Sequence, residues 1–147
     1  MRFAIVLVLI APVLLNLPPA AHGQDPLSAA RAQMVTALYT SDLAQEGTAL
    51  STAHRYLRQM INCLEGPKGK NFTVAAGNPC QKQGNGILVD MKAVVDAGNA
   101  RMGKALRFSV AAHVFALQGL ASINVEEAQT YARMSAFDIG NALEALD

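Results

Sequence analysis

The chain has 147 residues, of which 52% are hydrophobic, and its 12 basic and 11 acidic residues nearly balance. This composition lacks the excess of positive charge that nucleic-acid binding requires, so we expect no nucleic acid partner. The length suits a single compact domain with one core.

The beginning of the chain has the three parts of a secretory signal peptide. Arg2 supplies a positive charge, residues 3–17 form an apolar run, and small residues precede a cleavage point at Gln24. The run is shorter than the roughly 20 residues that span a bilayer, although an uncleaved anchor is the alternative. We predict a signal peptide over 1–23 and a single helical domain over 24–147, periplasmic or secreted, with no membrane span after cleavage.

The first predicted helix opens at Asp25 and Pro26, a favourable N-cap followed by proline at the first helical position. Apolar side chains then repeat every three or four residues, as in a helix that covers one side of a core. Gly47 weakens this pattern, so residues 27–64 form either two helices or one bent helix. Four side chains of the second part are expected to face away from the core: Arg55, Arg58, Gln59 and Asn62.

Residues 65–86 differ sharply, because five glycines and two prolines prevent regular structure there. Cys63 and Cys80 are the only cysteines, and in an oxidising compartment they are expected to form a disulfide that stabilises the fold by roughly 3 kcal/mol. A metal-binding or redox pair is the alternative, but Cys-x-x-Cys is absent and two thiolates do not complete a zinc site. The candidate interaction residues of this loop are Lys68, Lys70 and Phe72.

The third helical stretch covers about 87–121, and the fourth begins at Asn124, an N-cap with Glu127 three residues later. Gly98 and Gly103 each cost about 1 kcal/mol relative to alanine in a helix, so the third stretch is either continuous or broken near them. No segment alternates as a β-strand does. We predict an all-α fold, an antiparallel bundle of about four helices with one long disulfide-stapled loop.

Two histidines, His54 and His113, remain after signal cleavage. On facing helices they would ligate haem or a transition metal, whereas the alternative is a hydrogen-bonded core residue at 113 and a boundary residue at 54. The five methionines of the mature chain fall on or beside the apolar stripes and are expected to fill the core. Phe137 is predicted on the outer face of the last helix, as a partner contact or an ordinary surface residue.

No catalytic motif is present, since Gly-x-Ser-x-Gly, His-Glu-x-x-His and Glu-x-x-His are all missing. The glycine- and lysine-containing stretch at 66–71 is not a phosphate-binding loop, because Leu64 stands where its first glycine is required. We therefore name no catalytic residue and expect a protein without enzymatic activity or cofactor, with haem or a transition metal as the alternative.

Three motifs follow one another around the cysteines: INCLEGPKGKNF at 61–72, GNPC at 77–80 and GNG at 84–86. Together they resemble a module of small uncharacterised bacterial exported helical proteins with no known activity, which implies a bacterial periplasmic setting. Members often carry several histidines before the first cysteine, but this chain has only His54 there. We predict a non-catalytic binding module for an unknown protein or small molecule, since an ordered loop loses little entropy on binding.

Overall fold

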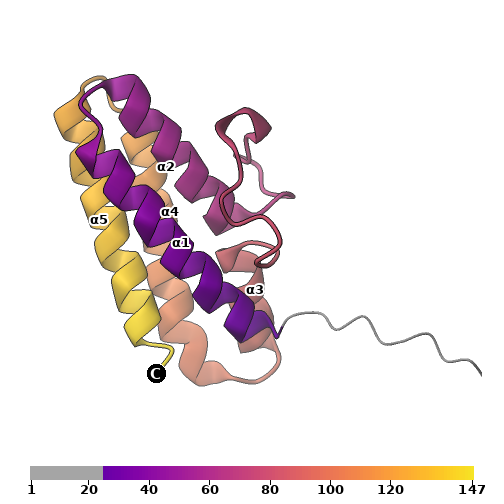
Figure 1. The fold of residues 1–147 in the computed structure, drawn as a ribbon. Helices are drawn as coiled ribbons and strands as arrows, with labels where there is room; N and C mark the ends of the chain where they lie inside the picture. The colour runs from indigo at the N-terminus through magenta and orange to yellow at the C-terminus, as the bar shows by residue number, and fades with distance from the viewer. Residues whose placement is uncertain (1–24) are drawn as a thin grey trace, which may run out of the picture.

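The computed structural model describes residues 25–147, so the predicted signal peptide lies outside the described residues (Figure 1). Over 25–147 the chain forms helices and no strand, which confirms the all-α prediction. The α-helices are α1 (Pro26–Glu46), α2 (Leu50–Glu65), α3 (Ile87–Asp96), α4 (Gly103–Ala121) and α5 (Val125–Glu144). Two short 3-10 helices lie between them, η1 (Val74–Ala76) and η2 (Ala100–Met102).

The four long helices form an antiparallel bundle in which α1 contacts α2 and α5, while α4 contacts the same two helices from the other side (Figure 1). The short helix α3 lies beside the beginning of α1 at one end of the bundle, and the long loop runs next to the last turns of α2. Arg31 of α1 pairs with Asp147 at 2.6 Å, which joins the start of the bundle to the end of the chain.

Two helix starts are capped as the sequence predicts. The Oδ2 atom of Asp25 accepts a hydrogen bond from the Ser28 amide at 3.0 Å, and Oδ1 of Asn124 accepts one from the Glu127 amide at 2.9 Å. The sequence left open whether two helical stretches are continuous, and in the structure both are interrupted. Residues 27–64 form two helices, and the third stretch is interrupted at Gly98, whose φ of +98° is incompatible with a continuing helix.

Alanine and serine side chains make up much of the interior beside larger apolar ones, and they let the helices approach closely. Serine hydroxyls bind backbone carbonyls of neighbouring helices: Ser41 Oγ donates to the Ala132 carbonyl at 2.7 Å, and Ser135 Oγ donates to the Ala112 carbonyl at 2.6 Å. Four of the five methionines fill the core as predicted, but Met134 is 39% exposed on α5. The expectation of a core role for Met134 is therefore wrong, because its side chain lines a groove on the surface.

Candidate functional site

A disulfide joins Cys63, in the last turn of α2, to Cys80 within the long loop, as predicted. Both residues are buried, and Cys80 packs with the core side chains of the bundle. The covalent bond therefore holds the middle of the loop against the bundle and leaves two smaller segments, 66–79 and 81–86, to be fixed by other contacts.

Asn62 fixes the first of these segments. Its Nδ2 atom donates to the carbonyls of Thr73 and Gly77 at 2.8 and 2.7 Å, and its Oδ1 atom accepts from the Thr73 amide at 2.8 Å. The prediction that Asn62 faces outward is wrong, since this residue is only 1% exposed and lies beneath the loop. Gln59 adds a contact from Nε2 to the Ala76 carbonyl at 2.8 Å.

Glu65, the last residue of α2, fixes the same segment from its other side. Its carboxylate accepts hydrogen bonds from the backbone amide and the side-chain amide of Asn71 at 2.6 and 2.5 Å. It also pairs with Nε2 of His113 on α4 at 2.6 Å. Burial raises the pKa of the Glu65 carboxyl, but the hydrogen bonds from Asn71 and His113 outweigh burial and bring this pKa below its ordinary value. The carboxylate is thus a structural acceptor, held charged by the donors that surround it.

Gln33 and Asp90 hold the end of the loop. Gln33, a buried residue of α1, donates from Nε2 to Asp90 Oδ2 at 2.6 Å and accepts from the Gly86 amide at 2.9 Å. Asp90, in the first turn of α3, accepts from the backbone and side-chain amides of Asn85 at 2.9 and 3.1 Å. Neither residue was predicted from the sequence, although Gln33 has the three- and four-residue spacing to Ala30 and Ala37 that marks the inward face.

The two ends of the loop cross in direct backbone contact. Gly66 and Gly86 both have positive φ, +71° and +119°. A Cβ atom on Gly66 would lie 1.7 Å from the Asn85 carbonyl oxygen, and one on Gly86 would lie 2.5 Å from the carbonyl group of Glu65. Glycine is required at both positions by conformation and by space.

The predicted interaction residues lie on the outer side of this loop. Lys68 and Lys70 are exposed or partly exposed, and Phe72 is half-buried. Lys82 is a third lysine at the surface, and the segment 66–86 contains no acidic residue. The loop therefore presents only positive side-chain charge to solvent, because the two carboxylates that bind it, Glu65 and Asp90, are buried.

The structure does not bring His54 and His113 together. Because Glu65 pairs directly with His113, the position of Glu65 marks where α2 meets that histidine. His54 lies eleven residues earlier on α2, about 16 Å away along the helix axis. This separation does not favour the predicted shared haem or metal site, and His113 instead matches the alternative of a hydrogen-bonded interior residue.

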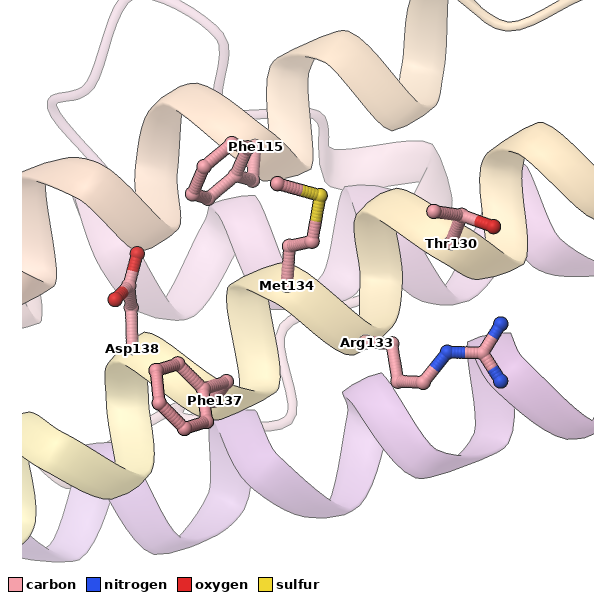
Figure 2. A pocket seen from close by; sticks show the side chains of 6 residues that line it. All are labelled: Phe115, Thr130, Arg133, Met134, Phe137 and Asp138. Atoms are coloured by element: carbon pink, nitrogen blue, oxygen red, sulfur yellow. The ribbon is translucent and has the colours of Figure 1, made fainter.

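A groove of about 520 Å³ lies on the outer face of α4 and α5 (Figure 2). Phe115 and Met134 face each other across it, and Phe137 stands at its edge with 72% of its surface exposed, as expected for an outward position. Asp138 lies at the end of the groove and points towards α4. Burial raises the pKa of the Asp138 carboxyl, because the charged form loses its hydration there.

Searches of protein family models, curated proteins and solved structures found no match to this chain. Over residues 25–147, no helix is both long enough and apolar enough to cross a bilayer. In the same range, no three His, Cys, Asp or Glu side chains gather closely enough to hold a metal ion.

We expect Glu65→Gln to lower the free energy of unfolding at neutral pH by about 1–3 kcal/mol, because the charge-assisted hydrogen bonds to Asn71 and His113 are weakened. A lowered pKa in the folded protein gives stability that is present above the ordinary carboxyl range and lost as pH falls through it. Urea unfolding between about pH 6 and about pH 3 should therefore show a steeper acid loss for the wild type than for Glu65→Gln. Glu126→Gln, at an exposed position, is the control, and equal slopes for wild type and Glu65→Gln would contradict the prediction.

Asp138→Asn is expected to change stability in the opposite direction. Burial raises the pKa of Asp138 in the folded protein, so the unfolded chain ionises at a lower pH than the folded one. The free energy of unfolding therefore falls as pH rises above the ordinary aspartate pKa. The asparagine variant should be more stable than the wild type at neutral pH, and this advantage should shrink in acid. Urea unfolding at the two pH values measures it, with exposed Asp42→Asn as the control. An asparagine variant less stable than the wild type at neutral pH would argue against it.

Proposed function

We propose that this chain is an exported, non-catalytic binding protein whose stapled loop, residues 66–86, is the recognition surface. The observation that carries the proposal is the set of hydrogen bonds that buried polar side chains of the bundle form with this loop. Each of Gln33, Asn62, Glu65 and Asp90 forms at least one hydrogen bond with the backbone or a side chain of this loop. Bundle helices need only short connections, so fixing a long irregular segment this thoroughly favours a role for its shape. A surface ordered in advance loses little conformational entropy when a ligand binds.

The charge on the loop indicates the chemistry of the partner. Lys68, Lys70 and Lys82 lie at the surface, and within residues 25–147 none of them forms an ion pair with a carboxylate. Complementary charge raises the rate and the specificity of association. We infer a protein or small molecule that presents negative charge to the loop.

Site-specific photo-crosslinking in the compartment to which the protein is exported tests this function. A photoreactive residue at Val74, which is 83% exposed on η1, should give a discrete adduct, whereas one at Tyr39, which is 64% exposed on α1, should not. Combined alanine replacement of Lys68, Lys70 and Phe72 should abolish the Val74 adduct while leaving the circular dichroism spectrum unchanged. No adduct from Val74, or an adduct that survives the triple replacement, would rule out the loop as the working surface.

Export itself is part of the proposal and rests on the signal-like residues 1–23 together with the disulfide. Protein recovered from the producing cell should begin at Gln24. The haem or metal alternative at His54 and His113 has a separate check, the visible spectrum and metal content of the same sample. A colourless protein without stoichiometric metal would remove that alternative.

A further inference from the structure

A separate groove of about 470 Å³ lies between α2 and the η1 segment of the loop. Ser51, His54, Arg55 and Arg58 line one wall, and their spacing of three and four residues places them on a single face of α2. The opposite wall includes Thr73, whose backbone is fixed by Asn62. The hydrogen bonds from Asn62 and Gln59 to this segment thus set the width of the groove.

The charged side chains that line the groove are all positive. Among its described lining residues none is acidic, and neither Arg55 nor Arg58 has a carboxylate partner within residues 25–147. Arg55 is held in place by Tyr56, since its guanidinium lies 4.6 Å from the ring centroid and donates to the phenol oxygen at 2.9 Å. Two guanidinium groups without a counter-ion are donors free to bind an anion, and a partly ordered one loses less entropy on binding.

His54 is a further polar residue in the lining of the groove. Its Nε2 atom is buried and has no hydrogen-bond partner among the described residues, the one side-chain atom there in this condition. Buried polar atoms are normally satisfied, so this imidazole nitrogen has a hydrogen-bonding capacity that the described residues do not use. The Ser51 hydroxyl adds a further donor to the same lining, whereas the Thr73 hydroxyl already donates to the Asn71 carbonyl at 3.3 Å.

We propose that this groove binds a phosphate group, with Arg55 and Arg58 as its charged contacts. Guanidinium forks match the oxygens of a phosphate in two parallel hydrogen bonds, and the Ser51 hydroxyl supplies a further donor. No lysine is among the described residues that line this groove, and Lys68 lines a different hollow near Asn85 and Val89. The groove is larger than one ion needs, so the phosphate is carried by a larger group, a soluble phosphate ester or a lipid headgroup. The inference deepens the proposed function, since the loop forms one wall.

The test uses the full mature chain and two kinds of probe. Glycerol phosphate is titrated while amide resonances are followed by NMR, and vesicles containing phosphatidylglycerol are co-sedimented with the protein. Binding should shift resonances of residues 51–58 and 73–76. Arg58→Gln should weaken it about tenfold or more, because a bidentate charge-assisted contact is lost. Arg107→Gln, the same charge change at an exposed position on α4, should leave it unchanged.

The two probes identify the source of the phosphate. If glycerol phosphate binds saturably and Arg58→Gln weakens this binding, the ligand is a soluble phosphate ester. If the protein only co-sediments with the vesicles, and Arg58→Gln weakens this, the ligand is a lipid headgroup. Absence of both, or equal weakening by Arg107→Gln, overturns the site. Loss of the Val74 crosslink in the triple loop variant is measured separately, so the proposed function and the phosphate site can fail independently.

Discussion

Replacing Gly86 with alanine is expected to lower the free energy of unfolding by about 4 kcal/mol, a large share of the total for a domain of this size. Two costs add. The new side chain is placed at φ +119°, where L-residues are strained, and its Cβ atom meets the backbone of Glu65 and Gly66 at 2.5 and 2.6 Å. Backbone atoms cannot rotate away as a flexible side chain does. Gly66→Ala should have a similar effect, since its Cβ atom meets the Asn85 carbonyl oxygen.

Two other glycines separate these costs. Gly98 also has positive φ, +98°, but nothing lies within 4 Å of its Cβ position, so Gly98→Ala should cost only the backbone strain, about 1–2 kcal/mol. Gly140 lies within α5 with open space around it, so Gly140→Ala should stabilise by about 0.5–1 kcal/mol. Urea unfolding of the four variants gives the comparison. A Gly86→Ala variant no less stable than Gly98→Ala would disprove the close backbone contact between the ends of the loop.

Removal of the disulfide is the second large effect. Cys63→Ser combined with Cys80→Ser should lower the free energy of unfolding by about 3 kcal/mol, because the closed loop between positions 17 residues apart no longer restricts the unfolded chain. The helices should remain, since the core side chains of α1, α4 and α5 are untouched and α2 loses only Cys63. Urea unfolding of the oxidised protein and the double variant measures the difference.

Reducing agent provides the control for this experiment. It should destabilise the wild type by a similar amount and leave the double serine variant unchanged. Thiol alkylation of folded protein taken from its own compartment should label neither cysteine. Two reactive thiols in that material would contradict the disulfide and, with it, the rigidity on which the recognition surface depends.

Local rules predicted most of the fold. Asp25 and Asn124 cap helices because short polar side chains satisfy free amides within three residues, and such contacts are readable from neighbouring positions. The sequence did not decide whether the helices break after Glu46 and at Gly98. A glycine weakens a helix, but tertiary packing determines whether the helix continues through it. α2 also begins at Leu50 without a side-chain cap, so no local signal marks its start.

The hydrogen bonds that anchor the loop could not be predicted from the sequence, for a different reason. Asn62 and Gln33 form hydrogen bonds with partners up to 57 residues away, and a helical wheel shows only that a polar side chain interrupts or borders an apolar stripe. Likewise, the helical wheel placed His113 near the middle of its apolar stripe and His54 at the edge of its own, but carried no information on the axial offset between α2 and α4. That offset brings His113 to Glu65 and leaves His54 in a groove beside the loop.

The ties of the loop run to helices from several parts of the chain: Gln33 belongs to α1, Asn62 to α2 and His113, through Glu65, to α4. Formation of this surface consequently requires the bundle to be folded. A ligand that recognises the ordered surface must therefore stabilise the whole domain by linkage, about 2.7 kcal/mol at a concentration one hundred times its Kd. Ligands of any chemistry can accordingly be sought by the rise they cause in the temperature of thermal unfolding.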